Sequence, residues 1–165
     1  MAASSPEANS LVASNAIGLT GPYAKLDICR FRHMFEGSSA RLAAMRITDD
    51  DVEKLNSNLL LFKEQVRVGN FDESAQTDVA FHHLIVEIAA VPLLTDIHKS
   101  FQQMLLDTLT MPARIHSRGW EPVVEHERIL EALKRRDPDE ATYYMQSHIT
   151  RSSERLGYVL PSDVL

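Results

Sequence analysis

Cysteine is nearly absent from this sequence, because Cys29 is the single one among 165 residues. The chain cannot form an intramolecular disulfide and cannot supply a thiolate-rich zinc or iron–sulfur site. Basic residues are also in deficit: 17 Lys and Arg stand against 23 Asp and Glu, for a formal net charge of -6. The sequence therefore lacks the electrostatic footprint of a nucleic-acid-binding module.

Long apolar runs and targeting signals are missing as well. The longest clearly apolar stretch covers residues 88–94, is interrupted by Pro92, and is far shorter than the roughly 20 residues of a membrane span. The first basic residue is Lys25, so the start of the chain has neither the positive region of a secretory signal nor an Arg-rich transit helix. These absences predict a cytoplasmic protein with no membrane partner.

The sequence does contain the composition of one globular domain, with 44% hydrophobic and 24% charged residues. Residues 1–20 are rich in Ala, Ser and Asn, and this predicts an N-terminal tail or linker with at most one short helix. We expect the folded domain to occupy residues 21–160 and a C-terminal tail to occupy residues 161–165.

Helical periodicity dominates from Tyr23 onward, and no stretch alternates apolar and polar residues for long enough to predict a strand. The predicted fold class is all-α, an antiparallel bundle of six to seven helices with short connections. Caps and breakers such as Thr48, Gly69 and Pro138 mark helix ends. Gly37 is an unexplained weak point inside the first helix. The expected helices cover about residues 22–45, 49–68, 72–90, 92–108, 122–136 and 138–156.

Four titratable side chains fall on the apolar faces of three predicted helices. Asp78 and His82 are four residues apart, so their side chains lie one above the other on the buried face of their helix. His126 lies on an apolar row of the helix over residues 122–136, and His148 lies on an apolar row of the last helix. The pattern predicts that three helices point one carboxylate and three imidazoles inward.

A buried set of this kind needs a partner. Burying an unpaired carboxylate costs several kcal/mol, and each unsatisfied imidazole adds about 1–3 kcal/mol. A divalent cation would satisfy all four groups, with Zn as the first choice and Ni, Mn or Fe as alternatives. Open coordination positions would accept water or the oxygens of a small acid. Two simpler interpretations stay open: Asp–His pairs at this spacing are common on helix surfaces, and buried histidines are often held by hydrogen bonds alone.

Arg32 is the other candidate for binding, because it lies near the inner side of the first helix, with Glu36 one turn later. A guanidinium in such a place matches the carboxylate of a ligand. An ion pair between Arg32 and Glu36 within the helix is the alternative interpretation. The other histidines show no convergence comparable to that of the four inward-facing groups; they are His33, His83, His98 and His116.

Motifs for catalysis are lacking. The sequence has no Gly-rich phosphate loop, no His-Glu-x-x-His pair and no recognisable Ser or Cys nucleophile motif. Glu87 and Glu125 are carboxylates suited to a general base beside a metal, but nothing singles them out. We therefore predict no catalytic residues and no enzymatic activity. A metal-dependent hydrolase or lyase and a metal-free helical interaction domain are the alternatives.

Four segments resemble a known family in order and spacing: DICRFRHMFEGSSARLAAMRITDDDVEKL, DVAFHHLIVEIAAVPLL, EHERILEALKRRDPDEA and MQSHITRSSERL. Together they are similar to the C-terminal effector-binding (FCD) domain of GntR-family transcription regulators of the FadR subgroup. The likeness covers about residues 25–156, and its most specific pieces are Asp78-x-x-Phe81-His82, the segment from His126 to Asp137, and His148.

The resemblance implies a domain that binds a small organic acid at a buried divalent metal and controls DNA binding by an attached winged helix-turn-helix. By position, the family's metal ligands correspond to Asp78, His82, His126 and His148, and its carboxylate-binding arginine corresponds to Arg32. The resemblance also implies a homodimer. We expect contact with DNA only through a winged helix-turn-helix domain that this chain does not contain.

Two positions depart from the pattern of the family. Arg30 stands where members often have an acidic residue, and Gly37 stands where they often have proline. Both lie on the helix that carries Arg32, so they bear on which acid is bound and leave the predicted fold unchanged.

Overall fold

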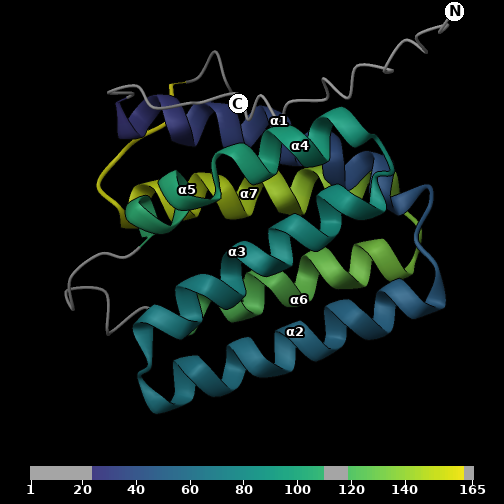
Figure 1. The fold of residues 1–165 in the computed structure, drawn as a ribbon, viewed down its shortest axis with the longest axis horizontal. Coiled ribbons are helices and arrows are strands. Elements are labelled where there is room, and N and C mark those ends of the chain that lie inside the picture. The colour runs from purple at the N-terminus through teal and green to yellow at the C-terminus, as the bar shows by residue number, and fades with distance from the viewer. Residues whose placement is uncertain (1–23, 110–118, 162–165) are drawn as a thin grey trace, which may run out of the picture.

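The computed structural model describes residues 24–109 and 119–161 (Figure 1). Within these residues all seven elements are helices, which confirms the all-α prediction, and none of them is long and apolar enough to cross a membrane. In chain order they are α1 (Lys25–Ala44), α2 (Asp49–Val68), α3 (Phe71–Ile88), α4 (Pro92–Ser100), α5 (Gln102–Leu109), α6 (Glu121–Lys134) and α7 (Pro138–Arg155). The predicted tail at residues 1–20 lies outside the described residues, and of the predicted tail at residues 161–165 the structure describes Pro161.

The long helices pack side by side as a bundle (Figure 1). Helix α1 packs against α7 and α3, helix α2 packs against α3 and α6, and α6 also packs against α7. The short helices α4 and α5 lie against α3. Burial of each large apolar side chain stabilises such a core by about 1.5–3 kcal/mol. The largest fully buried side chains of the main core are Leu55, Phe81, Ile85, Ile129, Leu130, Leu133, Met145 and Ile149.

Local chemistry fixes the ends of the helices that carry the core. The Thr48 side chain accepts a hydrogen bond from the Asp51 amide, and the Asp51 carboxylate accepts one from the Thr48 amide, so α2 begins in a capping box. Gly69 ends the same helix at a positive φ of 72°. The Asp137 carboxylate accepts from two amides of the first turn of α7. These boundaries agree with the sequence prediction.

The fourth predicted helix, over residues 92–108, is wrong as a single element. The structure divides it into α4 and α5 at Phe101, whose φ of -114° and ψ of 12° are not helical. The Phe101 ring is buried and packs edge-on against Phe31 of α1, with ring centroids 4.7 Å apart. Packing against α1 thus overrides a helical pattern that continues through this point.

Gly37 allows close approach of α1 and α7. A Cβ atom at position 37 would lie 2.7 Å from Cγ of Gln146 on α7, which is closer than two carbon atoms pack. The apparent weak point in the sequence is therefore a packing requirement, because the absent side chain makes room for Gln146.

Gly37→Ala is expected to destabilise the domain by about 1 kcal/mol. The gain in helix propensity is about 0.5–1 kcal/mol, whereas forcing a side chain into a packed interface costs about 1–3 kcal/mol. Urea unfolding measures the difference. The control is Gln146→Ala, in whose background Gly37→Ala should become stabilising. A single Gly37→Ala variant as stable as the parent would contradict the packing explanation.

Candidate metal centre

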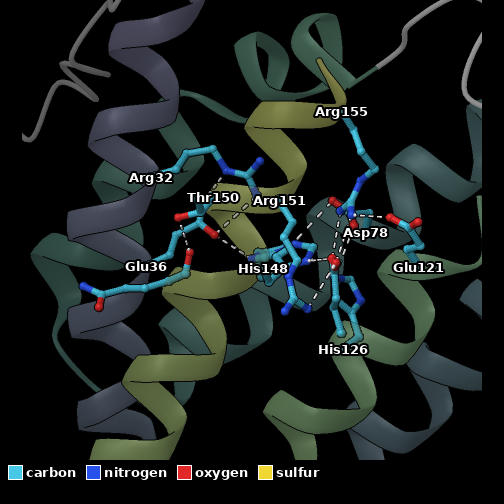
Figure 2. Close-up of polar contacts among 12 residues, drawn as sticks. Arg32, Glu36, Asp78, Glu121, His126, His148, Thr150, Arg151 and Arg155 are labelled. Atoms are coloured by element: carbon cyan, nitrogen blue, oxygen red, sulfur yellow. Dashed lines mark hydrogen bonds and ion pairs between the residues drawn. The ribbon is translucent and has the colours of Figure 1, made fainter. Parts of the chain in front are cut away.

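Asp78, His82, His126 and His148 converge at one point between three helices. Asp78 and His82 come from α3, His126 from α6 and His148 from α7. All four are buried, and each offers a ligand atom within 4.8 Å of the others. Figure 2 shows Asp78, His126 and His148 pointing toward one another. The structure thus brings together the four residues that the helical pattern placed on inward faces.

The contacts within the cluster are made by the Nε2 atoms of the imidazoles. The Nε2 atoms of His82 and His148 lie 3.2 Å apart. The Asp78 carboxylate approaches His126 Nε2 at 3.3 Å through Oδ1 and His82 Nε2 at 3.9 Å through Oδ2. Three imidazole nitrogens and one carboxylate therefore face a common point.

Two further carboxylates contact the opposite nitrogens of two of these rings. Oε2 of Glu36 lies 2.6 Å from His82 Nδ1, and Oε2 of Glu125 lies 2.8 Å from His148 Nδ1. A carboxylate has no proton to give, so each Nδ1 carries the proton of its ring; at His148 it donates a hydrogen bond to Glu125, whereas at His82 the contact with Glu36 is close but lies outside hydrogen-bond geometry. In a neutral imidazole the other nitrogen, Nε2, then holds a bare lone pair. The glutamates therefore fix both rings in the tautomer that metal ligands need.

This arrangement leaves two lone pairs facing each other across 3.2 Å, between Nε2 of His82 and Nε2 of His148. Neither nitrogen supplies a proton to the other, so the contact is repulsive unless a positive charge lies between them. Two metal–nitrogen bonds of about 2.0–2.1 Å can bridge this separation. His126 is also short of partners, because neither of its ring nitrogens makes a hydrogen bond of acceptable geometry within the described residues. The donor set thus fits a divalent cation.

Aromatic packing holds the third imidazole in place. The His126 ring stacks on Phe81 with ring centroids 4.2 Å apart and an interplanar angle of 8°. Phe62 of α2 stacks on the other side, with a centroid separation of 5.0 Å. These rings fix the orientation of His126 without contributing a hydrogen bond, so its Nε2, which lies 3.3 Å from Asp78, remains available to a metal.

Arginines neutralise the two outer glutamates. Nε of Arg32 donates to Glu36 Oε1 at 2.7 Å, and both residues are buried on α1. Arg155 donates to the two oxygens of Glu125 at 2.9 and 2.8 Å, and to Glu121 at 3.3 Å. The structure therefore contains the ion pair between Arg32 and Glu36 that was one of the two interpretations of the sequence.

The pKa shifts favour metal-binding protonation states. Burial lowers the pKa of His148 to about 3, although Glu125 acts in the opposite direction. Burial also lowers the pKa of His126, against the contact with Asp78. Burial alone would raise the pKa of Asp78, but His126 and the charges of the imidazoles hold it well below its usual range. Near pH 7 these two imidazoles are neutral and the carboxylate is ionised, as metal ligands must be.

The outer carboxylates are ionised as well. Burial alone would raise the pKa of Glu36, but Arg32 and His82 hold it well below its usual range. Arg155 and His148 outweigh the same effect at Glu125 and lower its pKa to about 2. The buried charges therefore occur in compensated groups, which is the condition for their burial.

Sequence reasoning missed the contacts that connect helices. Glu36 was recognised only as the neighbour of Arg32 and Glu125 only as a possible base, whereas the structure places each against an imidazole of another helix. Arg155 was not singled out at all. Its position seven residues, or two turns, after His148 was the one signal that could have placed it on the same face of α7.

The prediction that the other histidines do not converge is wrong for one pair. Nδ1 of His83 lies 3.1 Å from Nδ1 of His98, and Nε2 of His83 lies 3.3 Å from Glu87. The pair forms because α4 packs against α3, a contact that the sequence pattern does not contain. His33 is buried without joining the cluster, and His116 lies outside the described residues.

Fold and site together define an all-helical domain with three histidines and one aspartate gathered inside the bundle. Residues 27–151 match the FCD domain family, and this chain belongs to that family. The match confirms the resemblance seen in the sequence.

The relatives of this chain are bacterial regulators. It is 31% identical over 130 residues to the HTH-type transcriptional repressor NanR of Escherichia coli (strain K12), which covers 75% of this chain and 47% of the relative. It is 29% identical over 140 residues to NanR of Enterobacter sp. (strain 638), covering 82% and 52%. The chain thus spans about half the length of these curated relatives. Both are named as transcriptional repressors.

Two solved structures share the fold. Streptococcus agalactiae GntR matches with a TM-score of 0.68 and 22% identity over 79% of this chain and 58% of that one. E. coli McbR/YncC matches with a TM-score of 0.67 and 18% identity over 79% and 63%. At these identities the likeness concerns the arrangement of helices, and it supports the all-α bundle described above.

Proposed function

We propose that this chain is the effector-sensing domain of a bacterial transcription regulator of the FadR subgroup and binds a small organic acid at a divalent metal. Asp78, His82, His126 and His148 would hold the metal, with Zn the first choice and Ni, Mn or Fe the alternatives. The observation that carries the proposal is the pair of facing Nε2 lone pairs of His82 and His148, 3.2 Å apart beside the Asp78 carboxylate.

The metal, when bound, supplies an open coordination position for an oxygen of the acid. Glu36 and Glu125 favour the correct tautomer of His82 and His148, because their carboxylates lie 2.6 and 2.8 Å from the two Nδ1 atoms, and Glu125 accepts a hydrogen bond from His148. Arg32 would meet a carboxylate of the acid through guanidinium donors that Glu36 does not use. Its burial makes this charge effective, since little water screens it.

The signal would pass through the helices that supply the ligands. An acid that draws α3, α6 and α7 together favours one arrangement of the bundle over another, provided that it binds the two with different affinity. We propose that a separate winged helix-turn-helix domain responds to this difference on DNA and that the regulator acts as a homodimer in the cytoplasm. The homology to NanR repressors supports a role in regulation rather than in catalysis.

A thermal-shift screen of small mono-, di- and tricarboxylates tests the acid part of the proposal. At 100 times its dissociation constant, an acid adds about 2.7 kcal/mol of stability, which raises Tm by about 5–11 °C in a domain of this size. The shift should vanish with a chelator and in His126→Ala. An effector that shifts Tm equally with and without chelator would contradict binding at the metal, and a screen without any shift would contradict the assignment of an acid.

A further inference from the structure

A surface hollow of about 400 Å³ lies beside α6 and α7, outside the metal centre. Its volume is within the range of sites that bind small molecules. The hollow is lined by Trp120, Glu121, Val124, Glu125, Arg128 and Arg151.

The hollow has an apolar wall at the start of α6. Trp120 is the single tryptophan of the chain and is 49% exposed, and Val124, one turn later, is 37% exposed. A large indole left half in water outside a core provides a flat face for stacking another ring. The wall therefore suits a ligand with a planar apolar body.

The hollow also contains two arginines that its glutamates do not hold in close ion pairs. Glu125 already receives two hydrogen bonds from Arg155 and one from His148. Arg151 is exposed and lies 3.9 Å from Glu125, at the outer limit of an ion pair. Arg128 is exposed and makes no ion pair with another residue in the part of the chain that the structure describes. Two guanidinium groups are thus available to an anion.

Glu125 separates the hollow from the metal centre. It contacts His148 through Nδ1, whereas the metal would be bound at Nε2 on the other side of that ring. Figure 2 shows Arg151 and Arg155 extending from α7 on the side where Glu121 lies. An occupant of the hollow therefore meets the arginines without entering the coordination sphere of the metal.

We propose that this hollow is a second binding site, for an aromatic carboxylate. Trp120 stacks on the ring of the ligand, and Arg128 and Arg151 bind its carboxylate. This inference goes beyond the proposed function, because binding here needs neither the metal nor Arg32.

Trp120 itself reports occupancy, since tryptophan emission excited at a wavelength where the ligand does not absorb comes from this residue alone. Titration of the full chain with benzoate should change the emission with saturation. Arg151→Gln and Arg128→Gln should each weaken binding about tenfold, because each removes a charge-assisted contact. Both side chains are exposed, so the variants should remain folded. The matched control is Arg67→Gln, an exposed arginine of α2 paired with Glu64, which should bind benzoate like the parent.

Four further measurements decide the outcome. Acetate, which lacks the ring, and benzamide, which lacks the charge, should each bind at least tenfold more weakly than benzoate. Binding of benzoate should persist in chelator and in His126→Ala, so this result is independent of the metal centre. Equal binding of benzoate and benzamide, unchanged affinity in both arginine variants, or absence of a saturable signal would each overturn the proposal.

Discussion

Chelation of the metal-loaded domain is expected to lower its Tm by about 8–16 °C. A ligand present at 1,000 times its dissociation constant contributes about 4.1 kcal/mol, and 1 kcal/mol corresponds to about 2–4 °C in a domain of this size. The physical source of the effect is the electrostatics of the buried cluster. Without a cation, the lone pairs on Nε2 of His82 and His148 face each other at 3.2 Å, and both ring nitrogens of His126 lack hydrogen bonds within the described residues.

The measurement is the difference in Tm with and without chelator, compared between variants. His126→Ala should abolish this difference, because it removes one of four ligands while leaving the glutamates of the outer contacts intact. His83→Asn is the matched control: it changes the residue next to His82 on the same helix, and the chelator-dependent difference should persist even if the contact with His98 is lost. A chelator effect that survives in His126→Ala would contradict the assigned ligands.

The same cluster shows what one sequence can predict about a site. Asp78 and His82 share a helix and a face, so their proximity follows from helical geometry alone. His126 and His148 are placed inward because each lies on an apolar row, and burial of those rows brings their helices together. The helical periodicity of the sequence therefore predicts these four groups, because it shows which face of each helix is buried.

The contacts of Glu36 and Glu125 with the imidazoles depend on which helices become neighbours, and helical periodicity does not predict that. The contact between Glu36 and His82 joins α1 to α3, and the one between Glu125 and His148 joins α6 to α7. Such polar contacts form only where packing of the helices brings the two side chains within reach of each other. The break at Phe101 has the same origin, since the ring is buried against α1 at the cost of continuous helix.

Arg32 illustrates how an ambiguous pattern is resolved by burial. Its spacing to Glu36 is typical of exposed pairs on helix surfaces, which contribute little. Here both side chains are almost completely buried, at 4% and 3% exposure, and the Glu36 carboxylate also contacts His82. Breaking such a buried pair costs much more free energy than breaking a surface pair, because removal of one member leaves the other charge buried, unpaired and out of contact with water.

Glu36→Leu is accordingly expected to destabilise the domain by about 3–5 kcal/mol, because it leaves the Arg32 guanidinium buried and unpaired. This corresponds to a loss of about 6–20 °C in Tm. Urea unfolding of the chelated protein measures the effect without the contribution of a metal. The compensating variant is Arg32→Met combined with Glu36→Leu, which removes both charges and should recover most of the lost stability.

Metal affinity separates the two roles of Glu36. The double variant recovers the apolar packing but still lacks the carboxylate that lies 2.6 Å from His82 Nδ1, so its affinity for the metal should remain about 10–100-fold below that of the parent. Competition with a chromogenic chelator measures this affinity at equal folded fraction. If the double variant is as unstable as Glu36→Leu, the buried charge is not the cause of the loss. If its metal affinity equals that of the parent, then the contact with Glu36 does not set the tautomer of His82. The two readouts differ, because the loss of stability reports the buried charge of Arg32 and the metal affinity reports the contact of Glu36 with His82.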